Sequence, residues 1–410
     1  MAEQGLRVLA LAYRSLPPDV SQEHLEEQLT LVGLVGFRDP PRPEVPVAIR
    51  QCHEAGIKVI MITGDHPQTA VAIAREIGLV LASNAAVITG EQLRRLSEAE
   101  LQLALDAPEI IFARVGADQK LRIVRALKQK GETVAATGDG VNDAPALKHA
   151  DIGIAMGVTG TDVARESAHM VLMDDNFASI VAAVEEGRAV YDNMRKFLTY
   201  ILTHNVAELV PYLAFALFRI PLPLTVIQIL AIDLGTDVLP ALALGAELPE
   251  PEVMQRPPRS PKERLLSWPV LARAYLWLGL LEAAAAMAAF FFVLRAAGWN
   301  YGEALAADNP VYFQATTACL STIIAMQVVN VFLCRSESGS TFARGLFLNR
   351  LILVGIAAEI ALILLIDYTP WGNRLFGTAP ISINVWLYVV PFALAMLLLE
   401  ELRKALVRRL

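Results

Sequence analysis

Two carboxylates and an amide lie close together in one short stretch of the chain, 137–147 (TGDGVNDAPAL). The apolar run before it, 132–136, predicts a short parallel strand that glycines bring to an end. Asp139 and Asp143 are therefore expected at the carboxyl end of a strand, where open α/β sheets bind ligands. Together with Asn142 they suit an octahedral Mg²⁺ that also binds phosphate oxygens. Most Gly/Asp/Asn clusters are surface turns, but this one favours a phosphate site.

A second Thr-Gly-Asp turn follows the apolar run 57–62 and consists of Thr63, Gly64 and Asp65. Because it repeats the turn at 137–139, we expect one sheet to present both turns at the same edge, as a phosphate pocket requires. Residues 89–91 (TGE) are interpreted as the start of a helix rather than as a third such turn. A further strand over 110–113 leads into a basic helix. Most charges of this helix are expected to be solvated. Lys120, near its amino-terminal end, is interpreted as a phosphate contact.

Polar side chains also interrupt two long apolar segments in the second half of the chain. One segment carries His204, Asn205 and Glu208, and the other carries Asp233, Thr236 and Asp237. Ionisable residues inside a membrane are costly and indicate an ion path. Asp233 and Asp237 are four residues apart, so both carboxylates would lie on one face of a helix. Local unwinding at Gly235 and Pro240 would free carbonyl oxygens, and this oxygen set suits a hard cation.

Later apolar segments contain weaker candidates, Gln327, Asn330 and Glu359. Gln327 and Asn330 are three residues apart. They either join the cation site or hold helices together through hydrogen bonds. Glu282 stands alone in an apolar segment, and the sequence assigns it no role.

His204 allows two interpretations because it lies four residues before Glu208, on the same helical face. In the first, it is a neutral, hydrogen-bonded histidine at a helix interface. In the second, it gains a proton when the site is empty, and its charge replaces a transported cation. Burial and neighbouring carboxylates act in opposite directions on its protonation, so the sequence leaves both open.

The composition divides the chain into a part in water and a part in lipid. Of 410 residues, 55% are hydrophobic and only 19% are charged, too few charges for an ordinary soluble protein of this length. Apolar and charged stretches alternate up to about residue 195. Beyond it we expect six membrane spans, near 197–218, 222–244, 269–295, 311–333, 350–367 and 382–400. The net charge of −7 gives no indication of nucleic-acid binding. The three cysteines are too few for a disulfide framework, which agrees with a reducing cytosolic face.

The distribution of basic residues predicts the orientation in the membrane. Lys and Arg concentrate in 245–268, 334–350 and the carboxyl-terminal tail, and they include Arg335, Arg344 and Lys404. The positive-inside rule then places both termini in the cytosol. Between the two parts, residues 185–205 read as a continuous helical stalk of about 30 Å.

Seven strings are more specific together than any one alone: DPPR (39–42), TGD (63–65), FARVGADQK (112–120), TGDGVNDAPAL (137–147), NVAE (205–208), IDLGTD (232–237) and MQRPPR (254–259). With them the chain resembles the carboxyl-terminal half of a P-type cation-transporting ATPase of the calcium and sodium/potassium pump group. The resemblance covers essentially the whole chain. It implies an α/β Rossmann-like cytosolic domain of the haloacid dehalogenase type, followed by an all-α transmembrane domain with six helices.

The resemblance also implies domains, cofactors and roles. Residues 1–35 would end a nucleotide-binding domain, 36–185 would form a phosphorylation domain lacking its first strand, and 186–410 would form the transmembrane domain. Mg²⁺ would bind Asp139 with support from Asp143, and Arg114 would lie near ATP. The phosphoryl group would be held by Thr63, Gly64, Asp65, Lys120 and Asn142. The transport site would contain Asn205, Glu208, Asp233, Thr236 and Asp237. The protein would be a multi-pass protein of the plasma membrane.

One departure from the family pattern concerns the phosphorylated aspartate, which lies in a DKTGT motif. The nearest string here, 159–161, lacks the Asp-Lys pair. Because an aspartyl-phosphate cycle needs that nucleophile, we expect the chain to be inactive alone. The missing amino-terminal half would point to a truncated gene model, a fragment or a split partner chain.

Two other functions and a choice of cation remain open. The chain could be a membrane-anchored phosphatase of the haloacid dehalogenase type, although that chemistry needs the same nucleophile. It could also be a non-catalytic cation-binding subunit. Calcium pumps of the family typically have Asn where this chain has Asp233. That difference, together with Tyr200 and the loop 220–224, favours a monovalent cation (Na⁺, K⁺ or H⁺), with Ca²⁺ second.

Overall fold

The computed structural model describes residues 6–15, 26–38, 40–82, 85–306, 308–343 and 345–409. Asp39 of the DPPR string and Arg344 of the predicted basic loop lie outside the described residues. The chain forms two compact units. Unit 1 contains Met1–Glu185 and Pro251–Pro258, and unit 2 contains Glu186–Glu250 and Arg259–Leu410.

The described strands of unit 1 form three small sheets. Strands β1 (Arg7–Tyr13) and β2 (Thr30–Phe37) pair antiparallel. The parallel order β3-β5-β4 joins Met61–Ile62, Ile110–Ala113 and Ala86–Thr89. The parallel order β6-β7-β8 joins Ala135–Gly138, Ile152–Met156 and Met170–Leu172. The prediction of one sheet is therefore wrong for the described residues: β3 pairs only with β5 and β6 only with β7, so no described strand joins the two parallel sheets.

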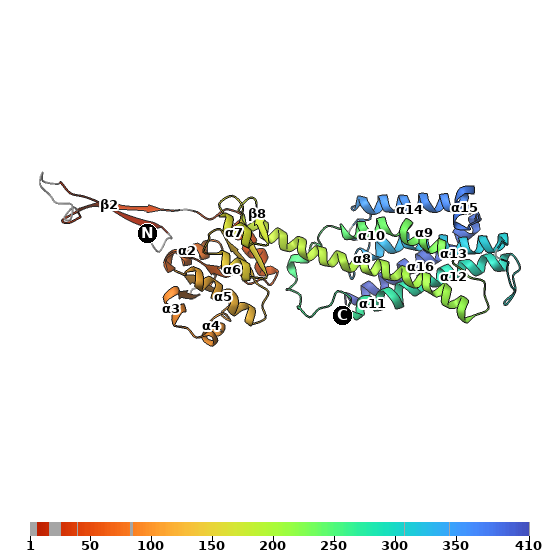
Figure 1. The fold of residues 1–410 in the computed structure, drawn as a ribbon, viewed down its shortest axis with the longest axis horizontal. Helices are drawn as coiled ribbons and strands as arrows, with labels where there is room; N and C mark the ends of the chain where they lie inside the picture. Colours follow the sequence, from red (N-terminus) through yellow and green to blue (C-terminus); the bar gives the residue numbers. More distant parts are fainter. Residues whose placement is uncertain are drawn as a thin grey trace. The chain divides into compact units, whose positions relative to one another are not determined.

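Helices follow the parallel strands in a β/α alternation (Figure 1). They are α1 (Val45–Glu54), α2 (Pro67–Glu76), α3 (Gly90–Arg95), α4 (Glu98–Ala104), α5 (Ala117–Gln129), α6 (Ala144–His149) and α7 (Asp162–Ser167). Thr89 caps α3 through a capping box, which confirms the helix start predicted there. Strand β6 begins three residues later and ends two residues later than predicted, so Thr137 and Gly138 belong to the strand.

Helix α8 (Phe177–Leu217) is continuous and confirms the expected unbroken stalk. Asn176 caps its start by accepting the Ala178 N–H at 3.0 Å. The helix also continues through Pro211, so the unwinding that a proline can cause does not occur there.

The remaining helices of unit 2 run alongside one another (Figure 1). They are α9 (Val226–Ala231), η3 (Ile232–Thr236), α10 (Val238–Gly245), α11 (Trp268–Leu271), η5 (Ala272–Leu278), α12 (Gly279–Ala296), α13 (Pro310–Cys334), α14 (Arg350–Tyr368), α15 (Pro370–Phe376) and α16 (Ile383–Val407). Segments η3 and η5 are π-helical, and η4 (Val253–Gln255) is a 3₁₀ turn in unit 1. The wide turn at η3 is the local departure from α-helix expected near Gly235.

Five helical segments of the described chain, rather than six, are long and apolar enough to cross a membrane: Val226–Gly245, Trp268–Ala296, Pro310–Cys334, Arg350–Tyr368 and Ile383–Val407. The predicted span 197–218 is not among them. It contains His204, Asn205 and Glu208, which lower its mean hydropathy. The polar residues that indicate an ion path thus also lower the hydropathy by which a membrane span is identified.

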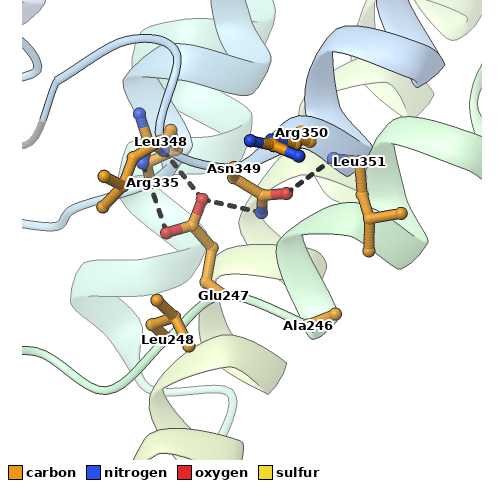
Figure 2. A pocket seen from close by; sticks show the side chains of 8 residues that line it. All are labelled: Ala246, Glu247, Leu248, Arg335, Leu348, Asn349, Arg350 and Leu351. Atoms are coloured by element: carbon orange, nitrogen blue, oxygen red, sulfur yellow. Dashed lines mark hydrogen bonds and ion pairs between the residues drawn. The ribbon is translucent and has the colours of Figure 1, made fainter.

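Arg335 and Lys404, counted among the basic residues of the predicted cytosolic regions, are buried inside unit 2. Arg335 donates to the Glu247 carboxylate from its Nε at 2.8 Å, and Asn349 donates to the same carboxylate at 3.0 Å (Figure 2). A cavity of about 230 Å³ adjoins this pair. Basic side chains at helix ends can thus bond to acids of neighbouring segments instead of facing water.

Candidate functional site

The Thr63-Gly64-Asp65 turn is tied to the end of strand β5. The Thr63 N–H donates to Phe112 O at 2.9 Å, and the Val115 N–H donates to Thr63 O at 3.1 Å. Asp65 O accepts the Arg114 N–H at 3.1 Å, and Arg114 takes a left-handed φ of 52°. The Thr63 hydroxyl accepts the Asp65 N–H at 3.1 Å. The structure therefore brings this turn and Arg114 together, with Gly64 and Asp65 exposed at the edge.

The loop after β6 is organised around the buried carboxylate of Asp143. Its Oδ2 accepts the backbone N–H groups of Asp139 at 3.2 Å and Gly140 at 3.1 Å. Its Oδ1 accepts Lys120 Nζ at 2.5 Å. Gly138 permits this packing, because a Cβ there would lie 2.3 Å from the Asp143 Cβ. Asp143 is thus held by three donors.

Asp139 and Asn142 are exposed beside this loop. Lys120 links the two parts of the site. It lies in α5, the helix that follows β5, and it binds Asp143 in the loop that follows β6. An exposed carboxylate next to a buried, fully hydrogen-bonded one fits a hard cation such as Mg²⁺, which keeps water ligands and takes few protein oxygens. Asp139 is placed to contact such an ion, and Asp143 to shape the loop.

In unit 2, part of the predicted cation site is assembled and buried. Asp237 Oδ1 accepts Gln327 Nε2 at 2.5 Å. The Thr236 hydroxyl lies 3.2 Å from Gln327 Oε1 and 3.1 Å from Ile232 O. All three side chains are buried, and they come from η3, from the residue after it and from α13. Gln327 thus contacts both Thr236 and Asp237, and these contacts agree with either of its two sequence interpretations.

Other predicted site residues lie elsewhere. Asn205 and Asp233 are exposed. Glu208 is buried and its Oε1 has no partner within the described residues, and neither carboxylate oxygen of buried Glu359 has one. The Asn330 side-chain oxygen accepts a hydrogen bond from Cys334 Sγ at 3.4 Å. Asn330 is therefore not bonded to Asp237, Thr236 or Gln327. Across the described residues, no group of three or more His, Cys, Asp or Glu is arranged to hold a metal ion.

His204 contacts Glu282, which the sequence left without a role. Its Nδ1 lies 3.0 and 3.1 Å from the two Glu282 oxygens, and both side chains are buried. The ring of Tyr200 meets the His204 ring edge-on at 4.2 Å. The partner was missed because Glu282 follows His204 by 78 residues and is the only acid of α12. Gly279, one turn earlier on α12, allows the close approach, since a Cβ there would lie 2.7 Å from Val206.

Comparisons with known proteins match both parts of the chain. A family model described as "Cation transporting ATPase, C-terminus" matches residues 221–406. Two models of haloacid dehalogenase-like hydrolases match residues 4–151 and 119–184. The unit 1 site falls within the hydrolase matches, and α9 to α16 fall within the ATPase match.

Three curated relatives are similar over most of this chain. They are a calcium-transporting ATPase of Bacillus subtilis (44% identical over 95% of this chain and 42% of the relative), a sodium/potassium-transporting ATPase subunit alpha-4 of Rattus norvegicus (37%, 99% and 45%) and a potassium-transporting ATPase alpha chain 2 of Oryctolagus cuniculus (38%, 98% and 42%). The chain spans less than half the length of these relatives. With a haloacid dehalogenase-like domain and helices of membrane-spanning length, the chain belongs to the family of P-type cation-transporting ATPases.

Proposed function

We propose that this chain provides the phosphorylation domain and the membrane helices of an ATP-driven cation pump that works through an aspartyl-phosphate cycle. The observation that carries the proposal is the pair of turns joined by Lys120 and Asp143. Neither turn contains the DKTGT nucleophile, so the proposal requires this motif on an amino-terminal segment outside these residues. A strand bearing it would find an unpaired edge on both β3 and β6 in the described structure.

Each residue of the unit 1 site has a proposed role. Asp139 would hold Mg²⁺, which when bound neutralises charge on the transferring phosphoryl group. Asp143 keeps the two backbone N–H groups of its loop in place. Lys120 would exchange its contact with Asp143 for phosphoryl oxygens. Further contacts would come from Thr63, Gly64, Asp65 and Asn142, with Arg114 toward ATP.

The test is phosphorylation by labelled ATP. The purified chain alone should form no acid-stable, hydroxylamine-sensitive phosphoenzyme, because it lacks the nucleophile. Co-expression with an amino-terminal segment that carries DKTGT should restore the label. Asp139→Asn should then abolish it, while Asp118→Asn, at an exposed position early in α5, should not. A hydroxylamine-sensitive label on the chain alone would refute the assignment.

The transported cation is proposed to bind between α8, η3 and α13. The ligands would be Asn205, Glu208, Asp233, Thr236, Asp237, Gln327 and Asn330, with His204 and Glu359 modulating affinity. The contacts among Thr236, Asp237 and Gln327 support this site. The exposure of Asn205 and Asp233 on helices of a membrane unit also supports it, because polar groups at that depth require a partner other than lipid.

We propose a monovalent cation first and Ca²⁺ second. The relatives are named for calcium, sodium/potassium and potassium transport, and so they leave the ion open. Asp233 and the neutral oxygens of Thr236 and Gln327 support the first choice. A reconstituted pump should show ATPase activity that rises with Na⁺ or K⁺ or changes with pH. Activation by micromolar Ca²⁺ alone would reverse the order.

The membrane is proposed to be the plasma membrane, with both termini in the cytosol. An even number of crossings is required for that orientation, so the α8 segment 197–218 must cross as well as the five apolar helices. Cysteine accessibility from each side of sealed vesicles would test it. If cysteines at the two termini are labelled from opposite sides of the vesicle membrane, the proposal is contradicted.

A further inference from the structure

A buried carboxyl group near the end of α14 takes no part in either proposed site. Asp367 is fully buried, and its Oδ2 lies 2.6 Å from the hydroxyl oxygen of Ser321 on α13. The same Ser321 oxygen lies 2.8 Å from the carbonyl oxygen of Thr317, one turn earlier. Ser321 therefore stands between two oxygens at hydrogen-bond distance.

A serine hydroxyl supplies one hydrogen atom, and both of these oxygens are acceptors. The Ser321 hydroxyl donates to the Asp367 carboxyl oxygen, and the Thr317 carbonyl oxygen lies within reach of the same hydrogen. A single, shared hydrogen atom compensates little for the burial of a charged carboxylate.

The surroundings of Asp367 agree with a neutral acid. Its Oδ1 has no hydrogen-bond partner, and no cation pairs with it, among the described residues. The polar groups of adjacent elements are committed elsewhere: Asn373 and Thr378 donate to Ile366 O, and the Tyr368 hydroxyl donates to Ile381 O. A buried carboxylate with one hydrogen bond and no counter-charge is expensive, whereas the carbonyl oxygen of a neutral acid is cheaper to leave unpaired.

We propose that Asp367 is a proton-binding site inside the membrane unit, with Ser321 as its hydrogen-bond partner. The site lies on the same two helices as proposed cation ligands but at another depth. Ser321 precedes Gln327 on α13 by about 9 Å, and Asp367 follows Glu359 on α14 by about 12 Å, at 1.5 Å per residue. The proposal does not rest on ATP-driven transport, since it concerns one bound proton in this chain.

Infrared spectroscopy of the full chain in lipid nanodiscs tests the proposal. The carbonyl stretch of a protonated carboxylic acid is separate from that of a carboxylate, and isotope-labelled aspartate identifies bands from Asp rather than Glu. At neutral pH we expect one protonated-aspartate band that Asp367→Asn removes. Asp308→Asn, the same change at an exposed position before α13, should leave the band in place.

Ser321→Ala guards against a variant that fails to fold. It keeps the carboxyl group but removes its hydrogen-bond partner, so the band should shift in frequency without being lost. Asp367→Asn should also fold normally, because its amide can hydrogen-bond to Ser321 as the neutral acid does. Identical spectra for the wild type and Asp367→Asn would overturn the proposal and indicate an ionised Asp367. A band that Asp367→Asn removes but Ser321→Ala leaves unmoved would support the bound proton and contradict the part assigned to Ser321.

Discussion

Asp143 acts on the unit 1 site by shaping a loop, and Gly138 is the residue that makes room for it. We predict that Gly138→Ala moves Asp143, because the new Cβ would lie 2.3 Å from the Asp143 Cβ. Overpacking of this kind destabilises by about 1–3 kcal/mol. The midpoint temperature of thermal unfolding and the affinity for Mg²⁺ should both fall. Gly140→Ala is the control, since its Cβ would make an ordinary contact at 3.6 Å from Asp143 Oδ2. Equal effects of the two substitutions would contradict the prediction.

Asp175 fixes the loop that borders Asp139, since Thr161 of that loop donates to Asp139 O at 2.8 Å. The Val158 N–H and the Thr159 hydroxyl donate to the Asp175 carboxylate and lower its pKa from 3.8 to about 2. A depressed folded pKa stabilises the fold above the unfolded pKa, and the contribution is lost as pH falls from about 4 to about 2.

We therefore predict that Asp175→Asn lowers the unfolding midpoint at pH 7 and has little effect near pH 2. The measurement is thermal unfolding of wild type and variant across this range. Thr159→Val removes one of the donors and should give a smaller difference with the same pH trend. A difference that does not change with pH would exclude the carboxylate as its cause.

The contact between His204 and Glu282 predicts a stability effect that the sequence did not anticipate. Removing a hydrogen-bond partner from a buried polar group costs about 1–3 kcal/mol, so Glu282→Ala, which leaves His204 Nδ1 without its partner, should lower the unfolding midpoint. Glu282→Gln keeps an acceptor for His204 Nδ1 and should cost less. Glu303→Gln, on an exposed loop, is the control. If all three variants have the same unfolding midpoint as the wild type, His204 is held by packing alone.

At the scale of elements, the sequence predicted strands and helices well where apolar runs were bounded by Gly, Pro or capping residues. Strand β5 and the start of α3 were predicted correctly. Strand β3 contains only Met61–Ile62, although the apolar run 57–62 is longer, because only these residues find a hydrogen-bonded neighbour. Strand length depends on pairing partners that local patterns do not contain.

The candidate site followed the same rule. Motif spacing brought Lys120 and Asp143 into one expected pocket, and the structure bonds them directly. The roles of Glu282 and Asp367 depend on contacts between helices far apart in the sequence, with His204 and Ser321. No periodicity in an apolar helix marks which acid will meet a partner.

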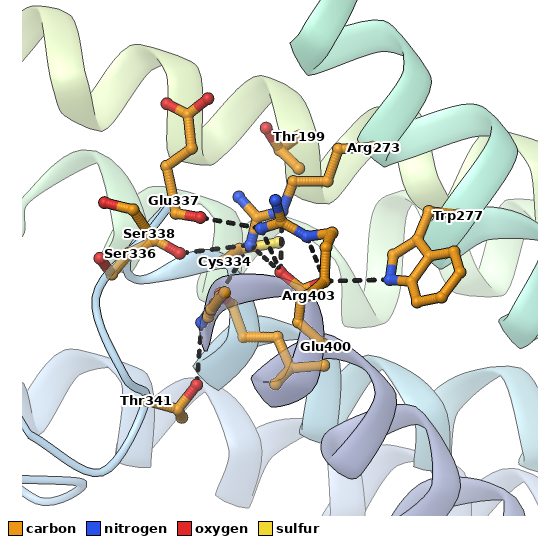
Figure 3. A network of polar contacts seen from close by, with 12 residues as sticks. Thr199, Arg273, Trp277, Cys334, Ser336, Glu337, Ser338, Thr341, Glu400 and Arg403 are labelled. Carbon is orange, nitrogen blue, oxygen red and sulfur yellow. Dashed lines mark hydrogen bonds and ion pairs between the residues drawn. The ribbon is translucent and has the colours of Figure 1, made fainter. Parts of the chain in front are cut away.

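Glu400 joins η5 to α16 within a cluster that also reaches α13. It lies among Arg273 of η5, Trp277 of η5 and Arg403 of α16 (Figure 3). Arg273 also donates to Leu333 O and Ser336 O at the end of α13. The cluster therefore fixes η5 and α16 against α13 through charged, buried hydrogen bonds.

We predict that Glu400→Gln destabilises unit 2 by about 3–5 kcal/mol, because it leaves Arg273 and Arg403 without their carboxylate. Glu401→Gln is the matched control: Glu401 is more exposed and accepts from Ser340 and Thr341 in a connecting loop. Thermal unfolding in nanodiscs gives the comparison. A loss for Glu401→Gln as large as that for Glu400→Gln would show that the cluster has no special role.

At the scale of the whole molecule, both units present groups that lack a partner in the described structure. Strands β3 and β6 each pair on one side only, and Asn205 and Asp233 are exposed on a membrane unit. If further helices complete the pump, they must cover Asn205 and Asp233, because lipid cannot solvate these side chains.

The last prediction tests this cover directly. The native cysteines Cys52, Cys319 and Cys334 are buried, so a cysteine introduced at an exposed position should be the main site of labelling. We expect Asn205→Cys to react with a membrane-permeant maleimide in the chain alone. Co-expression with an amino-terminal segment that carries DKTGT and four further spans should protect it. Leu398→Cys, exposed on α16, should remain reactive in both cases and controls for general access. Unchanged labelling of Asn205→Cys in the co-expressed complex would mean that the added helices pack elsewhere and that the proposed cation site is not completed by them.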